Sequence, residues 1–366
     1  MQFSEGADHM NESGAIVWLS SLRNVNCLVM EKLYDYFGSY LAVWDNISEK
    51  DSKIGIDKEV IENIVLKRDK HYFEHYMERL YKEQIGYITE VDDEYPQRLN
   101  YIFRKPKILY YKGQFKEPDQ SIAIVGSRKA TAYGSWLSED FAQRLSKENI
   151  AVVSGLAQGI DAHAHMGAIK SQAYTMAVIG SGINIQYPAQ NQRLYRQIEE
   201  LGCVVSEYPL DMPPLRHHFP ERNRIISGLS DAVLVVEAKQ KSGALITVNF
   251  GLEQGKEIMA VPGNINSLFS KGTNKLIQDG AKMVLSYNDV IEYFKGYTLE
   301  EKECIYALSF EEESVIRQLK SGPISIDKLA ENLKFDIKLL NGVLTLLEIK
   351  GIILRLPGSV VQLTKY

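Results

Sequence analysis

The feature that most constrains the fold is a region, residues 120–297, in which short apolar runs bounded by glycine alternate with amphipathic stretches. This alternation is typical of βα units, which build a parallel sheet covered by helices on both faces. The sequence therefore predicts a doubly wound α/β core. The expected strands are Ile122–Val125, Ala151–Val153, Thr175–Ile179, Cys203–Val205, Ala232–Val236, Glu257–Val261 and Lys282–Leu285. The expected helices are Tyr133–Lys147, Ile160–Lys170, Gln190–Glu200, Ile246–Gln254 and Asn274–Asp279.

The segment before this core is predicted to be helical. In residues 11–90, apolar side chains recur with helical spacing, as at Val60, Ile61 and Ile64. Residues 91–119 contain prolines and one short β-rich run and are predicted to form a connector. Residues 1–10 are interpreted as a cloning remnant and are excluded from fold reasoning.

The tail, residues 298–366, is predicted to be a winged helix. Three helices are expected, at Glu311–Lys320, Asp327–Asn332 and Asp336–Ile349, and a hairpin follows at Ile352–Leu356 and Val360–Leu363. Residues 301–366 contain nine Lys and Arg against nine Asp and Glu, so the module is neutral. DNA-reading wings are usually basic, so contact with a protein and a weak role in DNA binding are given equal weight.

Composition excludes several classes of protein. The 366 residues include only three cysteines, far apart, which excludes a disulfide scaffold and a cysteine metal site. No apolar run approaches the roughly 18 residues that a membrane span requires, and the N-terminus is acidic rather than basic. These features predict a cytoplasmic protein with no membrane contact. The net charge of −5 means that any binding to nucleic acid must rely on a local cationic site.

The strongest local signal for ligand binding is the turn Gly126-Ser127-Arg128, which follows the first core strand and precedes a helix. Anions bind at helix N-termini, so a phosphate would fit this turn. The spacing is not the dinucleotide GxGxxG, and a purely structural tight turn is the alternative. Glycine and serine turns recur at the ends of other strands, at Ser154–Gly159, Gly180–Gly182 and Ser242–Ala244, and suit an extended phosphodiester.

A cationic stretch, Arg216–Arg224, lies between two expected strands. A solvated loop is an equally good interpretation of it. We find no persuasive catalytic set: His163 and His165 are two residues apart and cannot chelate one metal from one helical face. Glu237 ends a strand and is a candidate base for a nucleotide hydrolase, although an isolated strand-end glutamate is more often structural.

The motifs together resemble the DprA (Smf) family of DNA-processing proteins. They follow the family's order, and the helical N-terminal region, Tyr95-Pro96 and the winged helix are also similar to the family's longer architecture. The motifs that carry the resemblance are Ile124–Arg128, Ser154–His163, Tyr187-Pro188, Ser206–Pro209, Phe219–Ile226, Glu237-Ala238, Ser242–Thr247 and Val261-Pro262-Gly263.

The resemblance implies an extended Rossmann-like core, an N-terminal domain of sterile-alpha-motif type and a C-terminal winged helix. It also implies sequence-independent binding of single-stranded DNA, a homodimer, and loading of the RecA recombinase during natural transformation, with no turnover, metal or cofactor. The DNA-binding residues that it implies are Gly126, Ser127, Arg128, Gly155, Lys170, His218, Phe219, Arg222, Asn223 and Arg224. The dimer residues are Leu268, Phe269, Leu276 and Ile277.

This sequence departs from the family pattern at one position. Many family members carry a basic residue just before the strand at Thr175, where this sequence has Ala173-Tyr174, so Lys170 or Tyr174 would replace it.

The alternative function is a phosphoribohydrolase-like enzyme on a related Rossmann-like core. Those enzymes carry a PGGxGT motif at the start of the corresponding helix. Here Ser242–Thr247 lacks the glycine pair, which favours the recombination mediator. For Leu276 and Ile277, packing of the last crossover helix onto the sheet is an equally good interpretation as a dimer contact.

Overall fold

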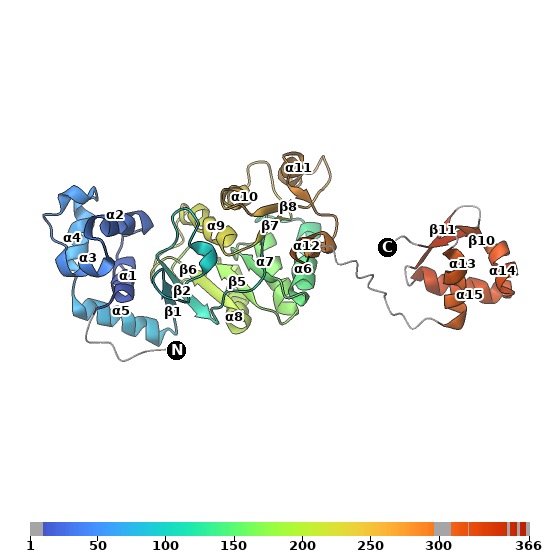
Figure 1. Cartoon of the computed structure of the whole chain (residues 1–366), viewed down its shortest axis with the longest axis horizontal. Coiled ribbons are helices and arrows are strands. Elements are labelled where there is room, and N and C mark those ends of the chain that lie inside the picture. Colours follow the sequence, from blue (N-terminus) through green and yellow to red (C-terminus); the bar gives the residue numbers. More distant parts are fainter. Residues whose placement is uncertain (1–9, 296–308, 321, 350–351, 357–358, 364–366) are drawn as a thin grey trace. The chain divides into compact units, whose positions relative to one another are not determined.

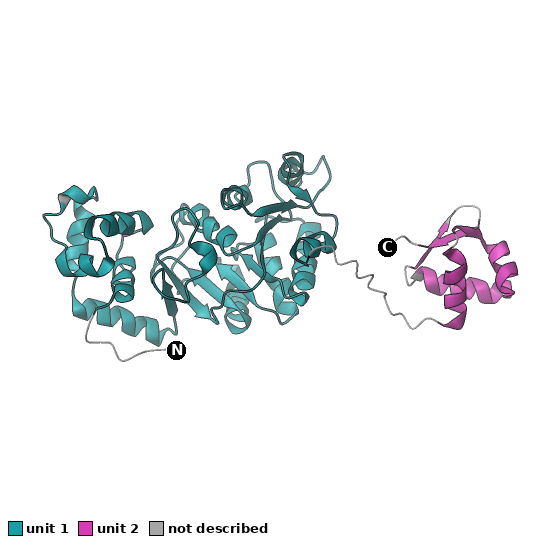
Figure 2. Cartoon of the chain, viewed as in Figure 1, with its two compact units in different colours: residues 1–297 teal, residues 298–366 magenta. Residues whose placement is uncertain are grey.

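The computed structural model describes residues 10–295, 309–320, 322–349, 352–356 and 359–363. The predicted cloning remnant lies almost wholly outside these residues. The chain divides into two compact units, residues 1–297 and residues 298–366 (Figure 2).

A nine-stranded sheet forms the centre of the first unit, with the strand order β1-β2-β6-β5-β4-β3-β7-β8-β9 (Figure 1). Strands β3 to β9 pair in parallel, and all seven strands expected in the core are present. These strands are almost entirely buried, which explains their apolar composition. They are β3 (Ser121–Val125), β4 (Ala151–Ser154), β5 (Thr175–Val178), β6 (Cys203–Ser206), β7 (Ala232–Val235), β8 (Glu257–Ala260) and β9 (Lys282–Met283).

The parallel strands are wound in two directions from β3. Strands β4, β5 and β6 follow on one side of β3, and β7, β8 and β9 on the other, so β3 and β7 are neighbours at the point where the order reverses. On one face lie α6 (Ala132–Lys147), α7 (Ile160–Lys170), α8 (Gln192–Leu201) and α12 (Tyr287–Lys295). On the other lie α9 (His218–Gly228), α10 (Ala244–Glu253) and α11 (Lys271–Gln278). The doubly wound fold is confirmed.

The described residues of the N-terminal region are mainly helical, as the spacing of the apolar residues predicts. The α-helices are α1 (Glu12–Ser20), α2 (Cys27–Phe37), α3 (Tyr40–Asn46), α4 (Lys58–Leu66) and α5 (Lys70–Lys82). Two further strands, β1 (Gly86–Thr89) and β2 (Ile108–Gly113), follow the helices and extend the sheet. Strand β2 pairs antiparallel with β6, and β1 pairs antiparallel with β2. The predicted connector therefore contributes β2 to the sheet.

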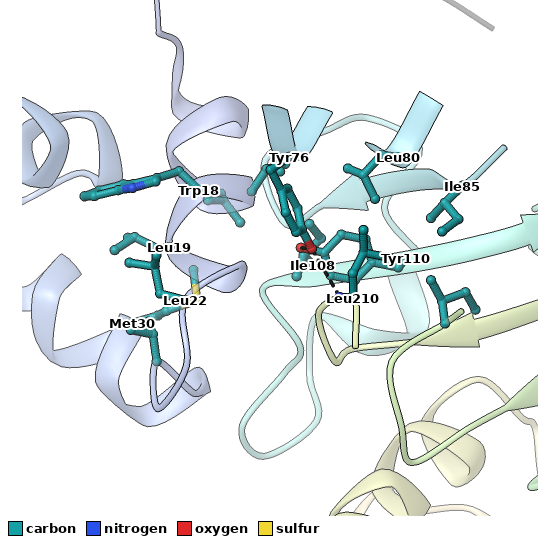
Figure 3. Close-up of a cluster of buried hydrophobic side chains, with 14 of the residues drawn as sticks. Trp18, Leu19, Leu22, Met30, Tyr76, Leu80, Ile85, Ile108, Tyr110 and Leu210 are labelled. Carbon is teal, nitrogen blue, oxygen red and sulfur yellow. Dashed lines mark hydrogen bonds between the residues drawn. The ribbon is translucent and has the colours of Figure 1, made fainter. Parts of the chain in front are cut away.

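A chain of buried hydroxyl groups links the helices to the sheet. The N–H of Leu210 donates to the Tyr76 hydroxyl (3.3 Å), which donates to Tyr110 (3.1 Å) (Figure 3). Tyr110 also contacts Ser20 Oγ at 2.6 Å. Ser20 Oγ in turn donates to the carbonyl of Val17 (2.8 Å), so Tyr110 is the donor to Ser20. Each hydroxyl donates once and accepts once, which satisfies polar groups placed inside an apolar cluster.

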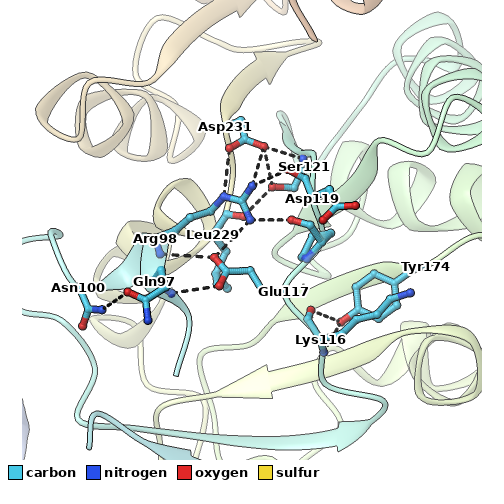
Figure 4. A network of polar contacts seen from close by, with 11 residues as sticks. Gln97, Arg98, Asn100, Lys116, Glu117, Asp119, Ser121, Tyr174, Leu229 and Asp231 are labelled. Atoms are coloured by element: carbon cyan, nitrogen blue, oxygen red, sulfur yellow. Dashed lines mark hydrogen bonds and ion pairs between the residues drawn. The ribbon is translucent and has the colours of Figure 1, made fainter. Parts of the chain in front are cut away.

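A second network fixes the connector against the amino ends of β3 and β7 (Figure 4). The Arg98 guanidinium forms two bonds to the Asp231 carboxylate, at 3.1 and 3.2 Å, and also reaches Glu117. Asp231 accepts a further bond from the backbone N–H of Ser121, the first residue of β3 (2.8 Å). This bidentate pair is less than a third exposed and holds the edge of the sheet opposite to the strands' carboxyl ends.

The second unit has the winged-helix order that the tail predicts. Helices α13 (Phe310–Leu319), α14 (Ile326–Leu333) and α15 (Ile337–Ile349) precede the strands β11 (Ile353–Leu356) and β12 (Val360–Leu363). A short strand, β10 (Ile324–Ser325), pairs with β12 and was not predicted. Gly351, the expected end of α15, and most of the expected hairpin turn lie outside the described residues. In the described part of the chain, no helix is both long and apolar enough to span a membrane.

We predict that Tyr110→Phe lowers the free energy of unfolding by about 1–3 kcal/mol, because the Tyr76 and Ser20 hydroxyls each lose a buried partner. Urea unfolding would measure this loss. Tyr101→Phe is the control, since Tyr101 is 91% exposed, and it should change stability by at most about 0.5 kcal/mol. Equal effects of the two substitutions would contradict the hydroxyl chain.

Candidate nucleic-acid interface

A cavity of about 710 Å³ opens where the strand order reverses, outside the carboxyl ends of β3 and β7. One wall is the turn after β3, and another is the segment Lys239–Ala244 after β7. The N-terminal half of α9 closes a third side. Open α/β sheets bind ligands at this reversal point, because the two diverging crossovers leave a crevice there.

The described residues that line the cavity are strongly cationic. Five of the basic side chains are exposed: Arg128, Lys129, Arg216, Lys239 and Lys241. The acidic residue in the lining is Asp161, whose side chain is buried. A chain with a net charge of −5 therefore concentrates positive charge at one site, which favours an anionic ligand.

Aromatic rings lie beside these cations. The guanidinium carbon of Arg128 is 5.3 Å from the ring centroid of Phe219, and that centroid is 5.7 Å from the ring of Tyr187. Phe219 and Tyr187 both line the cavity, and each is partly exposed. A cation and two ring faces side by side can hold a phosphate and stack a base.

Arg222, one of two buried arginines of α9, forms the floor of the site. The residue is 4% exposed, and its guanidinium donates to the carbonyl of Gly155 (2.8 Å) and to that of Val178, at the carboxyl ends of β4 and β5. A Cβ on Gly155 would lie 2.5 Å from Arg222 Nη2 and 2.8 Å from Asp161 Oδ2, so the Asp161 carboxylate lies beside the same guanidinium. Burial raises the pKa of Asp161 to about 6, against the opposing effect of Arg222. Arg222 thus joins α9 to the sheet and leaves phosphate contact to the exposed cations.

The N-terminus of α6 is already occupied by a protein carboxylate. Glu237, at the end of β7, accepts bonds from the N–H of Thr131 (2.9 Å) and from its hydroxyl. Thr131 caps α6 by accepting from Gly134 N–H (3.0 Å). The expectation that a phosphate binds at this helix end is therefore corrected. The helix end that faces the cavity is that of α10, whose first residue, Ala244, lines it.

The glycines of these turns serve close packing within the protein. A Cβ on Gly126 would lie 2.6 Å from the Ile160 side chain, and one on Gly159, where φ is +80°, would lie 2.3 Å from the carbonyl of Ser127. The N–H of Ser127 already donates to the carbonyl of Glu237 (2.8 Å). Glycine is thus required here for contact between the turns after β3 and β4, which corrects our expectation that it admits a ligand.

The structure brings together six of the ten expected DNA-binding residues: Gly126, Ser127, Arg128, Phe219, Arg222 and Asn223 line the cavity. The other four do not line it. Gly155 lies beneath Arg222, and Arg224 is buried in a bidentate pair with Glu207 (2.9 and 2.6 Å). His218 stacks on Tyr208 at 4.0 Å.

The fourth, Lys170, is the last residue of α7 and pairs with Glu139 of α6. Helix α7 begins at the cavity and runs toward the start of β5, so its C-terminal residue lies at the opposite edge of the sheet. Tyr174 also lies outside the lining, and its hydroxyl donates to the carbonyl of Lys116 (3.1 Å). Neither residue replaces a basic group at the cavity.

Sequence reasoning missed several lining residues. Lys239 and Lys241 directly follow β7, and their place beside the Ser242-Gly243 turn was a usable signal. Arg216 belonged to the recognised cationic stretch, and Lys129 follows Arg128 directly. Tyr187 could not have been assigned, since its contact with Phe219 joins segments 32 residues apart, from position 187 to position 219.

A family model described as DNA recombination-mediator protein A matches residues 86–295. The chain belongs to the DprA family. A second model, the DprA winged helix domain, matches residues 305–359.

Relatives in several bacteria agree with this assignment. DNA processing protein DprA of Streptococcus pneumoniae is 44% identical over 208 residues, which are 56% of this chain and 73% of the relative. Protein Smf of Synechocystis is 34% identical over 290 residues, 77% of this chain and 73% of the relative.

Two solved structures of DprA proteins are also similar. The X-ray structure of the S. pneumoniae protein has a TM-score of 0.66 at 34% identity and covers 77% of this chain and 98% of that chain. A structure of the Helicobacter pylori protein, described for its single-stranded DNA binding mode, has a TM-score of 0.53 at 28% identity. It covers 58% of this chain and 95% of that chain.

Other titratable groups in the DprA core have structural partners. The Glu237 carboxylate is 7% exposed and caps α6, so the candidate hydrolase base is held away from the cavity lining. His163 contacts Glu139, and His165 is fully buried beside Thr175 (2.8 Å). Burial lowers the pKa of His165 to about 3, which keeps the imidazole neutral. Within the described residues, no cluster of His, Cys, Asp or Glu could hold a metal ion.

The expected dimer residues lie near β9, the edge strand. Leu268 is 60% exposed, whereas Phe269 is partly buried, with the Lys239 ammonium 5.0 Å from its ring. Leu276 packs against the core, as the packing alternative has it, and Ile277 lines a shallow surface cavity. Three further apolar residues in this part of the sequence are exposed, with exposed fractions of 91% for Ile265, 47% for Met283 and 71% for Leu285.

We predict that Arg222→Ala lowers the free energy of unfolding by about 3–5 kcal/mol, because Asp161 and two strand-end carbonyls lose a buried partner. Arg128→Ala, at an exposed position of the same cavity, should cost at most about 0.5 kcal/mol. Chemical denaturation followed by circular dichroism compares the two variants. Equal losses would contradict the structural role of Arg222.

Proposed function

We propose that this protein binds single-stranded DNA without sequence preference in the cavity at the carboxyl ends of β3 and β7. The main observation in support is the set of five exposed cations beside the Phe219–Tyr187 ring pair. Cations contact any phosphate, and a ring stacks on any base, so neither contact depends on sequence. Membership of the recombination-mediator family supports the same ligand.

We further propose that the bound strand is passed to the RecA recombinase, as in natural transformation. The description of the family as a recombination mediator supports this step. On the winged helix, Leu339 and Leu346 of α15 are seven residues apart, lie on one face of the helix, and are each about half exposed. An apolar helix face favours contact with a protein over contact with phosphates. RecA filament formation on strands coated with single-strand-binding protein, with and without this protein, tests the transfer.

The proposed function includes no catalytic turnover. The hydrolase alternative needs a base directed at the ligand, whereas Glu237 binds the backbone and hydroxyl of Thr131. Binding, positioning and release of a strand account for the cations and rings of the cavity without a reacting group.

We also propose a homodimer through the edge at β9. The supporting observation is a group of exposed apolar side chains on or near the edge strand β9, since such groups mark protein interaction sites. They are Ile265, Leu268, Met283 and Leu285. A two-fold dimer would carry two DNA cavities on one particle and so raise the effective concentration of a second strand contact.

We predict that Arg128→Ala weakens binding of dT oligomers and reduces the slope of log affinity against log salt by roughly 0.7, the loss of one phosphate contact on a single strand. Fluorescence anisotropy over a salt series measures both quantities. Arg104→Ala is the matched control, because Arg104 is exposed but lies outside the cavity lining. An Arg128→Ala protein with unchanged affinity and slope would remove the cavity assignment.

We predict that light scattering gives twice the one-chain mass of 41.5 kDa for the wild type, and the one-chain mass for Leu268→Glu. A buried carboxylate without a partner would disfavour the dimer. Leu252→Glu, at a 61% exposed position of α10, should remain dimeric. A monomeric wild type, or a Leu268→Glu protein that stays dimeric, would exclude this interface.

A further inference from the structure

Helix α6 carries two large exposed aromatic side chains in its first two turns. Tyr133 and Trp136 are each 59% exposed, their ring centroids are 6.1 Å apart, and the rings are inclined by 36°. Residues 133 and 136 are three apart, so both rings lie on one face of the helix. They form a small aromatic surface, which we call the α6 aromatic pair.

The core does not require this pair. The buried side of α6 is made by Leu137, Phe141 and Leu145, which pack against the sheet and α7. The other two tryptophans of the chain lie inside the N-terminal helical region, where Trp18 is fully buried and meets Trp44 edge to face at 4.8 Å. Trp136 is thus the tryptophan with most of its surface available to a ligand.

The pair continues the cationic cavity along the chain. Arg128 and Lys129 line the cavity, and α6 begins three residues after Lys129, at Ala132. Trp136 is about 6 Å along the helix axis from that first residue. The ring of Phe219 contacts the same Arg128. One aromatic ring therefore contacts one of these cations directly, and the α6 aromatic pair follows them within eight residues of Arg128 in the sequence.

The charges on α6 also mark the extent of this surface. Residues 132–138 include no acidic side chain, and the first acids are Glu139 and Asp140. Glu139 is paired with Lys170 and His163, and Asp140 is paired with Arg144 (2.9 Å). The first two turns of α6 thus contribute no carboxylate of their own, and Glu237, whose carboxylate lies at the start of the helix, is only 7% exposed.

We propose that a single strand longer than the cavity runs past Arg128 and Lys129 and stacks its bases on Tyr133 and Trp136. The inference rests on the proposed function and adds a second stacking site to it. Stacking of one base on an exposed ring is expected to contribute roughly 5- to 150-fold in affinity, whatever the base. A strand too short to leave the cavity gains nothing from the pair.

Tryptophan emission tests the proposal on the full chain, because Trp136 is the most exposed of the three tryptophans. A dT oligomer of about 16 nucleotides should quench this emission, whereas one of about 4 should bind without quenching. Trp136→Phe should abolish the quenching. Trp136→Ala should weaken binding of the long oligomer by roughly 5- to 150-fold and leave the short one unchanged.

Tyr101→Ala is the matched control, since Tyr101 is 91% exposed and lies outside the cavity lining, and it should bind both oligomers like the wild type. Tyr133→Ala provides a second variant with the same expected preference for weakening the long strand. Thermal unfolding of each variant verifies that it is folded.

The outcomes separate this inference from the proposed function. If the long oligomer binds the wild type and Arg128→Ala weakens it, but no quenching occurs and Trp136→Ala binds normally, the aromatic pair is excluded while the cavity stands. If Trp136→Glu changes the molecular mass in light scattering without changing DNA affinity, the pair is a contact between copies and the inference is overturned. If neither oligomer binds the wild type, both proposals fail together.

Discussion

The geometry of the binding region depends on the buried guanidinium of Arg222. Its bonds to the carbonyls of Gly155 and Val178 fix α9 across the carboxyl ends of β4 and β5. Those carbonyls lie at the carboxyl ends of their strands, where a donor from another element contributes to satisfying them. Because α9 is held in this way, Phe219, one helical turn earlier, reaches Arg128 on the far side of the cavity. A structural arginine thus positions the cation and ring that face a ligand.

The amino ends of the sheet strands carry stabilising contacts, whereas their carboxyl ends border the cavity. At the amino edge, Arg98 and Asp231 form a bidentate pair, and the neighbouring backbone groups are satisfied within the protein. At the carboxyl edge, the crossovers diverge beside β3 and β7, and the basic side chains there extend into an open cavity. The protein is acidic overall, so the proposed binding of a polyanion depends on this local arrangement rather than on the net charge.

The proposed sequence-independent recognition would follow from the kinds of groups at the site. The exposed cations can meet phosphates, which repeat along any strand, and the rings offer flat faces that accept any base. The N-terminus of α10 adds the partial positive charge of its helix dipole. The N-terminus of α6 does not, since Glu237 already occupies it. Among these groups, the ones best placed to contact a strand are exposed side chains rather than the glycine turns.

The sequence by itself determined the strands and most of the helices, since buried parallel strands must be apolar runs and their crossovers must be amphipathic. It also determined the position of Arg128, at the end of the first core strand. It did not predict α9, whose first turn contains Pro220 and a dense group of charges. Without that helix, the three arginines of Arg216–Arg224 looked equivalent. Helical spacing places Phe219, Arg222 and Asn223 on one face and turns Arg224 toward Glu207. Only the tertiary structure decided that Arg222 is a support, Arg216 an exposed cation and Arg224 an ion-pair partner, because burial and pairing depend on segments distant in sequence.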